Sequence, residues 1–552
     1  MLLLKKLTMN ELKNLIHKKI LDSLSELSYP IKTFSLTPSK NKNFGDLSTN
    51  ISLVISKDLK KNPMVIGENI IDHFSKKLPD FISQVSITKP GFINFKIKDK
   101  YFQDQIKTIL MQNENYGKGN SGVGKTANVE FVSANPTGPL TIGHGRNAIL
   151  GDAVSNILEW QGYKVTREYY FNDAGRQMRI LGQSVKARYD ELQGNEFSFP
   201  DDGYQGNYIK NIAKEIFNSK NKKNKLNISD FTKYAEKAIF KEIKISLKKL
   251  GIIFDTFTNE KTFYENGDIE KLLEDLKQKN LIYEKDNATW FKTTSLGNEQ
   301  DRVYIKSTGE PTYRVPDTAY HKNKIERNYD LIVDIFGADH ADTYPDVLLA
   351  LNALSYDTEH IKVLLYQFVT LLKNGEKMKM STRKANFITL DSLVDEVGLD
   401  VVRYFFVMRS MNTHLDFDLD LATDQSDKNP VFYLQYAYAR ICNIIKRGKE
   451  SNINFNENFK PHILSEVDEI NLLKYLIRFP EYVNLSYENF EPQNIANYLQ
   501  ELATRFHKFY GNCRVLSDDI HKSKSRMALI KSVQIVLKNG LTILGVSTPE
   551  RM

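Results

Sequence analysis

One stretch decides the fold of this 552-residue chain: Glu130-Phe131-Val132-Ser133-Ala134-Asn135-Pro136-Thr137-Gly138-Pro139-Leu140-Thr141-Ile142-Gly143-His144-Gly145-Arg146. Its apolar start predicts a buried strand, its proline and glycine residues predict a loop, and the spacing of apolar residues after Gly143 predicts a helix. Unpaired N–H groups at a helix start favour phosphate. We therefore expect a phosphate site where Gly143 and Gly145 allow close approach and His144 donates a hydrogen bond; an empty strand–loop–helix turn is the alternative.

The composition is ordinary for a soluble globular protein, with 41% hydrophobic and 26% charged residues. The length predicts three or four domains of ~150 residues. No apolar run approaches the ~18 residues of a membrane span, and the start of the chain is too briefly apolar for a signal peptide. Cys442 and Cys513 lack metal-ligand spacing. We expect a cytoplasmic protein without a metal site of its own, whose net charge of +8 permits a polyanionic partner.

Strands alternate with helices from about residue 127. The segments 164–171, 331–336 and 361–365 have strand character. This alternation predicts an α/β fold with a parallel sheet, whose ligands bind at the carboxyl ends of the strands. Several polar groups follow such ends: His144, Asn172-Asp173 and Asp339-His340.

A second phosphate motif competes with the first. Gly119-x-x-x-x-Gly124-Lys125-Thr126 has the spacing of a P-loop. A P-loop needs a strand before it and a helix after it. Here the preceding segment is polar and the following one, Ala127 to Ser133, has strand character. The sequence therefore favours a loop between domains over a P-loop.

A cluster of cations, Lys377-Met378-Lys379-Met380-Ser381-Thr382-Arg383-Lys384, follows a predicted strand. Such charges on a loop can neutralise a polyphosphate leaving group, and a mobile loop can close over a nucleotide. A solvated basic loop is the alternative.

Both motifs resemble signatures of class I aminoacyl-tRNA synthetases. The string Ser-Ala-Asn-Pro-Thr-Gly-Pro-Leu-x-x-Gly-His-Gly-Arg is similar to the arginyl-tRNA synthetase form of the HIGH region, and Lys379-Met380-Ser381-Thr382 resembles the KMSK loop. Two departures stand out. Thr141 replaces the first His and cannot carry a positive charge, and Thr382 replaces the final Lys, whose charge Arg383 or Lys384 can supply.

The resemblance implies four parts. These are an α+β N-terminal domain (1–115) that meets the tRNA corner, a Rossmann-type catalytic domain (120–390) with a mostly helical insertion at about 185–300, connecting helices (391–427), and an all-α anticodon-binding domain (428–552). It covers nearly the whole chain and is weakest at 195–290.

The resemblance also implies roles for single residues. The catalytic group is His144, Lys379, Thr141 and Lys384. The ATP-binding group is Gly143, Gly145, His144, Met380 and Ser381. The arginine-binding group is Glu130, Asn135, Tyr313, Asp317 and His340. Carboxylates suit a guanidinium, and Tyr313 and Asp317, four apart on a predicted helix, share one face. The alternatives are a helix cap for Asp317, a surface charge for Glu130 and a structural role for His340.

Tyr433, Tyr436 and Arg440 combine aromatic rings with a cation on a helix predicted to open at Asn429. Such a surface can stack unpaired bases, although neighbouring apolar residues indicate that much of the helix is core. The surrounding sequence is similar to the helical anticodon-binding domain of arginyl-tRNA synthetases.

The implied function is that of an arginine–tRNA ligase. ATP, with Mg²⁺, activates L-arginine, and the 2′-hydroxyl of tRNA(Arg) receives it. The resemblance further implies that tRNA must bind before activation, and we expect a monomer. The rival hypotheses are a synthetase for another amino acid, such as lysine, and a catalytically silent tRNA-binding paralogue, which the replacements Thr141 and Thr382 motivate.

Overall fold

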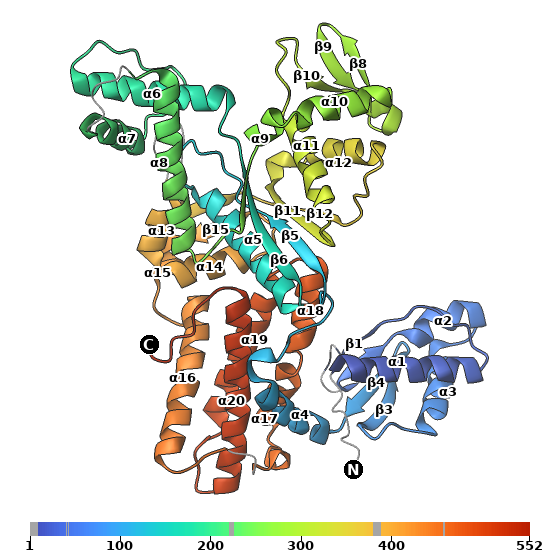
Figure 1. Ribbon diagram of the computed structural model, residues 1–552. Coiled ribbons are helices and arrows are strands. Elements are labelled where there is room, and N and C mark those ends of the chain that lie inside the picture. The colour runs from blue at the N-terminus through green and yellow to red at the C-terminus, as the bar shows by residue number, and fades with distance from the viewer. Residues whose placement is uncertain (1–8, 40, 42–43, 220–225, 379–387, 456–458) are drawn as a thin grey trace.

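The computed structural model describes residues 9–39, 41, 44–219, 226–378, 388–455 and 459–552. A five-stranded parallel sheet lies at the centre of the molecule, in the order β12-β11-β5-β6-β7 (Figure 1). Its strands are β5 (Thr126–Glu130), β6 (Lys164–Phe171), β7 (Thr256–Asn259), β11 (Leu331–Gly337) and β12 (Ile361–Tyr366). The strand order reverses between β5 and β11, and ligands of such sheets bind beside this point. The predicted parallel α/β sheet is confirmed.

Two lobes rise above the carboxyl edge of this sheet (Figure 1). One contains α6 (Gly175–Gln193), α7 (Asn207–Asn218) and α8 (Ile228–Lys249). The other contains α9 (Lys261–Glu265), α10 (Asp268–Gln278), α11 (Arg314–Glu326), α12 (Tyr344–Ala353) and an antiparallel sheet of β8 (Ile282–Lys285), β9 (Ala288–Phe291) and β10 (Arg302–Ile305).

The expected helical insertion at about 185–300 needs correction. Strands interrupt its helices, because β7 pairs with β6 as the edge strand of the central sheet and β8 and β9 form part of a separate antiparallel sheet. A four-residue strand such as β7 is too short to give a clear alternation in a Lys- and Asn-rich segment.

The P-loop alternative is excluded by the elements that flank it. Gly124 lies in a turn with φ +81°, and β5 begins at Thr126, where a P-loop would need a helix. The helix that follows β5 is α5 (Ile142–Trp160), which opens within the first signature.

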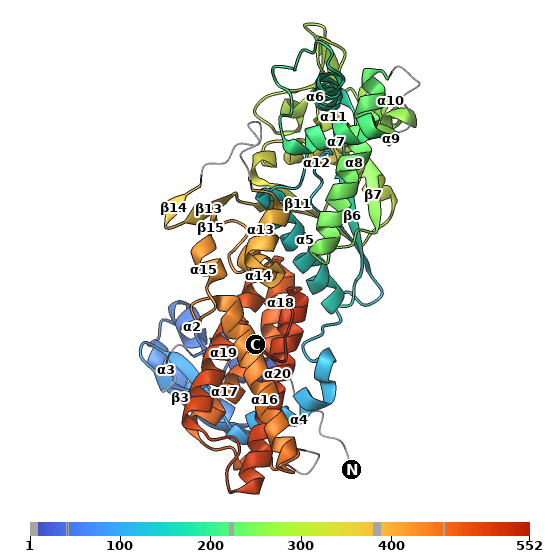
Figure 2. The same cartoon turned by 90° about the vertical axis from the view of Figure 1, so that its left-hand side faces the viewer.

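A small three-stranded sheet lies beside α5 and has the order β14-β13-β15 (Figure 2). It consists of β13 (Val369–Lys373), β14 (Glu376–Lys377) and β15 (Leu415–Asp418). The helices α13 (Leu390–Val397) and α14 (Leu399–Val407) lie between β14 and β15 in the sequence, and α15 (Leu419–Thr423) follows β15. The segment from 391 onward was expected to be entirely helical. That expectation is wrong at β15, which pairs in parallel with β13.

The C-terminal part is a bundle of α16 (Pro430–Glu450), α17 (Val467–Leu476), α18 (Phe479–Asn489), α19 (Gln493–Asn512) and α20 (Ile520–Ile543). The predicted start of α16 is confirmed, since the Asn429 side chain accepts hydrogen bonds from the N–H groups of Val431 and Phe432. Most residues of α20 are buried, as befits the central helix of a bundle.

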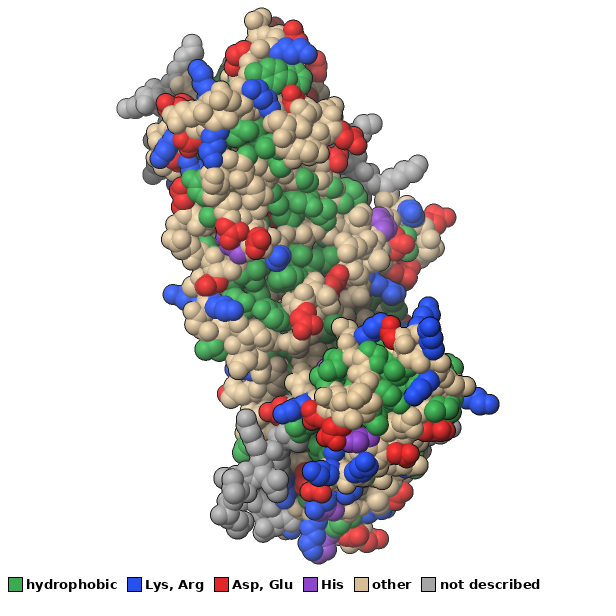
Figure 3. Space-filling model, turned by 90° about the vertical axis from the view of Figure 1, so that its right-hand side faces the viewer, with side chains coloured by type: hydrophobic (Ala, Val, Ile, Leu, Met, Phe, Trp, Pro, Cys, Tyr) green, Lys and Arg blue, Asp and Glu red, His purple; other side chains and the backbone are tan. Residues whose placement is uncertain are grey.

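The N-terminal unit is an antiparallel sheet, in the order β1-β2-β4-β3, packed with three helices. It contains α1 (Met9–Glu26), β1 (Leu36–Pro38), β2 (Leu47–Thr49), α2 (Ile51–Leu59), α3 (Pro63–Ser75), β3 (Ile82–Thr88) and β4 (Phe92–Ile97). Figure 3 shows that it carries many of the Lys and Arg side chains on this face of the molecule.

The expected boundary of this unit at 115 is too late. The next helix, α4 (Asp99–Gln112), packs against α17 and α20 instead, and Gln103 donates a hydrogen bond to the Leu464 carbonyl at 2.7 Å. The N-terminal unit therefore ends near residue 97. Within the described ranges, no helix is both long and apolar enough to cross a membrane.

Candidate active site

The loop between β5 and α5 contains two residues in the left-handed region. Val132 has φ +67° and Ser133 has φ +43°, which is costly for a β-branched residue. The side chain of Asn147 on α5 compensates: its Oδ1 accepts from the Val132 N–H at 2.9 Å, and its Nδ2 donates to the Ile335 carbonyl of β11 at 3.0 Å. Asn147 thus fixes the bend that aims the chain from β5 into α5.

His144 occupies the first turn of α5 as a neutral donor. Its Nδ1 accepts a hydrogen bond from the Thr141 N–H at 3.2 Å, so the ring proton is on Nε2. Burial lowers the pKa of His144 to about 4. A neutral Nε2–H beside the free N–H groups of a helix start suits a phosphate oxygen.

The two small residues of the signature differ in their surroundings. A Cβ on Gly143 would meet only the Thr141 hydroxyl, at 3.8 Å, whereas one on Gly145 would lie 2.4 Å from the side chain of Leu390. Gly145 therefore has a packing reason to be glycine, since α13 lies against α5 there. The space at Gly143 fits the expected approach of a ligand.

The described chain that follows the second signature adjoins the first signature. Lys379, Met380, Ser381 and Lys384 lie outside the described residues. The described chain resumes at Ile388, and Thr389 then forms an antiparallel bridge with Thr141. The Leu390 N–H donates to the Leu140 carbonyl at 2.9 Å. The residue after the cationic segment is thus fixed beside the start of α5.

A buried ion cluster lies at the reversal point of the sheet. The Lys324 ammonium, which is fully buried, contacts the carboxylates of Glu130 on β5 and Asp334 on β11. His321 contacts Asp334 at 3.1 Å. Although burial opposes both shifts, Lys324 and His321 lower the pKa of Asp334, and Asp334 raises the pKa of His321. Glu130 is therefore not a surface charge: Ser133 and Lys324 contact its two oxygens.

Two further carboxylates face this cluster without a cation of their own. Asp317 lies one turn before His321 on α11, and Glu260 follows β7. Burial, with help from Glu260 and Glu130, raises the pKa of Asp317 to about 7. Burial also raises the pKa of Glu260, although Tyr170 and Asn172 donate hydrogen bonds to it at 3.0 and 2.8 Å. Among the described residues, Asp317 has no side-chain ion pair. The site has an excess of negative charge that a cationic ligand would neutralise.

The remaining candidates for arginine lie farther from this charge. Asn135 joins the signature loop to the end of β6, since its Oδ1 accepts a hydrogen bond from the Asn172 N–H at 3.0 Å. Tyr313 is 69% exposed at the start of α11, and His340 is exposed after β11, with its ring 5.4 Å from that of Phe336. Tyr313 and Asp317 thus share a helix but differ in burial, and the binding roles of all three residues stay predictions.

Sequence reasoning named Asp317 but missed other residues of the site. His321 and Lys324 follow Asp317 at the spacing i+4 and i+7, which is one helical face and was a usable signal. Glu260 directly follows a strand end, but the strand itself was not recognised. Asn147 gave no local signal, because its partners are on other elements.

The predicted aromatic surface is present on α16 and α19. The Arg440 guanidinium lies 4.4 Å from the Tyr436 ring and 5.0 Å from the Tyr510 ring, and Tyr433 contacts the His507 ring at 4.7 Å. Tyr436 is 40% exposed. Burial and the nearby Arg440 lower the pKa of His507 to about 4, so Arg440 and not His507 supplies the positive charge among these rings.

The sheet order, the signature helix and the C-terminal bundle define a class I aminoacyl-tRNA synthetase. Residues 105–406 match the family model "tRNA synthetases class I (R), catalytic domain". Residues 10–97 match "Arginyl tRNA synthetase N terminal domain" and residues 434–552 match "DALR anticodon binding domain".

The relatives agree on one family. The chain is 45% identical to "Arginine--tRNA ligase" of Salinibacter ruber over 97% of this chain and 98% of that protein, and 47% identical to the enzyme of the same name from Desulfotalea psychrophila over 93% and 94%. The fold is that of Thermus thermophilus arginyl-tRNA synthetase, with a TM-score of 0.77, 20% identity and coverage of 98% and 100%. The chain belongs to the arginyl-tRNA synthetase family, the arginine–tRNA ligases.

Proposed function

We propose that this chain activates L-arginine with ATP at the carboxyl edge of its central sheet and then transfers the arginyl group to tRNA(Arg). The observation that carries the assignment of the site is the unpaired negative charge of Asp317 and Glu260, which lies on the same edge as the start of α5. A guanidinium binds carboxylates through directed hydrogen bonds. The helix start, on the other side, binds phosphate. The two halves of the site therefore suit the two substrates.

On the arginine side, the ion cluster prepares the pocket. Lys324 neutralises Glu130 and Asp334, so these carboxylates support the pocket, while Asp317 and Glu260 face the ligand. Glu130 thus contributes to the pocket by holding Lys324 and not by contacting arginine itself. Asn135, Tyr313 and His340 are proposed to contact the rest of the amino acid, as the family resemblance implies.

On the ATP side, catalysis is positioning and charge stabilisation. The arginine carboxylate attacks the α-phosphorus, the bond to the pyrophosphate oxygen breaks, and pyrophosphate leaves. The Nε2–H of His144 donates to the phosphate, Thr141 fixes its tautomer, and Gly143 gives room to the nucleotide. Lys379 and Lys384, with Met380 and Ser381, are proposed to meet the phosphates from the second signature.

Mg²⁺ is proposed to arrive with ATP. Glu130, His321 and Asp334 lie close enough to one another to hold a metal, but the Lys324 ammonium contacts two of them, so these residues do not fit a divalent cation. Ligands from the triphosphate itself fit better. When bound, the ion would neutralise phosphate charge.

The tRNA is proposed to bind along the C-terminal bundle, with unpaired bases on Tyr433, Tyr436 and Arg440. Activation that waits for tRNA, a monomeric state and a cytoplasmic location stay predictions.

Arginine-dependent exchange between ATP and pyrophosphate, measured with and without tRNA(Arg), tests the proposal. We expect exchange only with tRNA, and none when lysine replaces arginine. Exchange without tRNA would contradict the gating but not the substrate. No exchange in either case, with tRNA still bound, would favour the silent paralogue.

A further inference from the structure

Arg146 follows the first signature on α5 and is fully buried. Its guanidinium has no carboxylate partner among the described residues. Every hydrogen bond recorded for it goes to a main-chain carbonyl: Nη1 donates to Gln367 at 2.5 Å and to Thr413 at 3.1 Å, and Nη2 donates to Ser410 at 3.0 Å and to Thr413 at 3.1 Å. A longer contact of 3.5 Å reaches Phe368. Burying a charge is costly unless hydrogen bonds replace the lost water, and here main-chain carbonyls supply them.

The carbonyls come from two connections, which Arg146 contacts together and which also contact each other directly. Gln367 and Phe368 join β12, a strand of the central sheet, to β13. Residues 410–413 form a turn between α14 and β15, and the Gln367 N–H donates to the Met411 carbonyl at 2.9 Å. Both β13 and β15 belong to the small sheet from which the chain continues into the second signature. Arg146 therefore lies between the helix of the first signature and the sheet that precedes the second.

The same turn also reaches the C-terminal bundle. The Ser410 hydroxyl donates to Glu491, between α18 and α19, at 2.7 Å. The 410–413 turn consequently contacts the signature helix through Arg146 and the bundle through Glu491. The planar guanidinium offers several donors in fixed directions, as an ammonium does not, and so can hold the turn against α5.

We propose that Arg146 is a positioning residue for adenylate formation: its guanidinium sets the small sheet of β13, β14 and β15 against the start of α5, where His144 and Gly143 lie. This inference rests on the proposed function of that site. It predicts that loss of the guanidinium geometry impairs the chemical step and leaves the arginine pocket and the tRNA surface intact.

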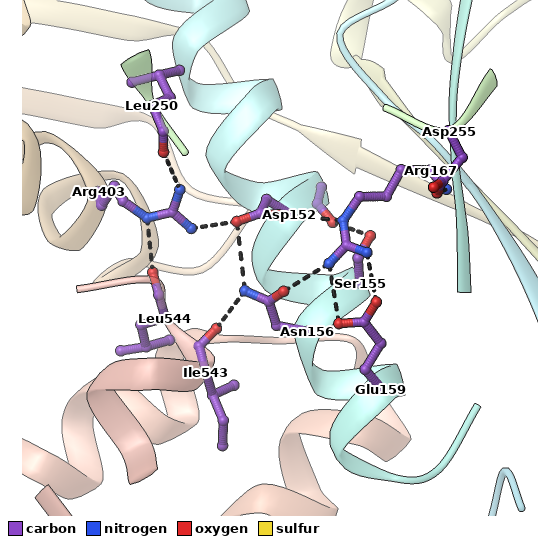
Figure 4. Close-up of polar contacts among 11 residues, drawn as sticks. Asp152, Ser155, Asn156, Glu159, Arg167, Leu250, Asp255, Arg403, Ile543 and Leu544 are labelled. Atoms are coloured by element: carbon purple, nitrogen blue, oxygen red, sulfur yellow. Dashed lines mark hydrogen bonds and ion pairs between the residues drawn. The ribbon is translucent and has the colours of Figure 1, made fainter. Parts of the chain in front are cut away.

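A matched control contacts α5 at Asp152, between one and two turns after Arg146. Arg403 on α14 is equally buried, at 2% exposure. It donates to the carbonyls of Leu250 at 2.8 Å and Leu544 at 3.2 Å, and it contacts Asp152 on α5 (Figure 4). Arg403 joins α5 to the end of α20, away from the signature. Replacing Arg403 therefore removes a buried arginine that contacts α5, and none of its recorded polar contacts is with the small sheet.

The test compares Arg146→Lys with Arg403→Lys in the full chain with tRNA(Arg) at saturation. For Arg146→Lys we expect kcat of arginine-dependent ATP–pyrophosphate exchange to fall on the order of 10- to 100-fold. The KM for arginine and the Kd for tRNA should change by less than about twofold. For Arg403→Lys we expect a similar fall in melting temperature and a kcat within about threefold of the parent.

Three results would overturn the proposal. The first is an equal loss of kcat in both variants. The second is a loss in Arg146→Lys that affects kcat, the KM for arginine and tRNA binding alike. The third is failure of both Arg146→Lys and Arg146→Gln to fold, by circular dichroism, while Arg403→Lys folds, which would assign Arg146 to stability alone. Absence of exchange in the parent chain would instead contradict the proposed function, so the two failures are distinct.

Discussion

The backbone N–H of Thr141 donates a hydrogen bond of 3.2 Å to Nδ1 of His144. The contact fixes the proton of His144 on Nε2, and its donor is main chain. The Thr141 hydroxyl lies 3.3 Å from the same Nδ1, but the N–H alone is enough to hold the ring proton on Nε2. The replacement of the family's first His by Thr141 therefore leaves the tautomer of His144 intact.

The first prediction concerns these two residues. His144→Ala should reduce adenylate formation roughly 100-fold, since one donor to the phosphate is lost, with little change in tRNA affinity. Thr141→Ala should have a much smaller effect, because the N–H remains. Single-turnover exchange measures both. Since the pKa of His144 is about 4, its titration should not affect the rate above about pH 5; equal losses in the two variants would refute the assignment.

The second prediction concerns arginine and pH. A guanidinium needs an ionised Asp317, whose pKa is about 7 in the free protein. Below pH 7 the carboxyl group is protonated, so arginine must displace a proton and its KM should rise as pH falls; above pH 7 the KM should level off. Calorimetry in buffers of different ionisation enthalpy should show proton release near neutral pH.

Asp317→Asn provides the control for that pH dependence. The loss of the charge should weaken arginine binding by about 2–3 kcal/mol, or roughly 30- to 150-fold, and should abolish the proton release. A variant that still releases a proton on binding would place the titrating group elsewhere.

The third prediction concerns stability. Lys324→Met leaves Glu130 and Asp334 buried without their ammonium and should reduce the free energy of unfolding by about 3–5 kcal/mol. Lys322, on the same helix, is also buried but contacts a single carboxylate, the partly exposed Asp275, at 3.0 Å, so Lys322→Met should cost less than Lys324→Met. Urea denaturation of both variants checks the difference, and similar costs would mean that the cluster is not essential to the sheet.

The fourth prediction concerns tRNA. Tyr436→Ala removes an exposed ring that stacks with Arg440, and it should weaken tRNA(Arg) binding by about 1–2 kcal/mol. Tyr438 on the same helix is only 6% exposed, so Tyr438→Phe should leave binding unchanged. A filter-binding titration distinguishes the two variants. Unchanged binding in Tyr436→Ala would show that the bases contact another surface.

Much of the fold was predictable because its signals are local. Strand 164–171 was predicted with the bounds that β6 has, and the start of α16 followed from the Asn429-Pro430 pair, whose capping contacts are within three residues. The errors have a common cause. β7 and β15 are four residues long, and each is stabilised by pairing with a distant strand, which a short stretch of sequence does not record.

The sequence by itself determined the strand–loop–helix signature, the parallel sheet, the helical C-terminal part and the resemblance to the arginyl-tRNA synthetases, because periodicity, breakers and caps act between near neighbours. Only the tertiary structure decided which charges are paired. Glu130 meets Lys324 across 194 residues of chain, and among the described residues Asp317 and Glu260 then have no ion pair. Electrostatic free energy depends on distance and burial in space, so the charge that we propose selects the ligand was set by folding.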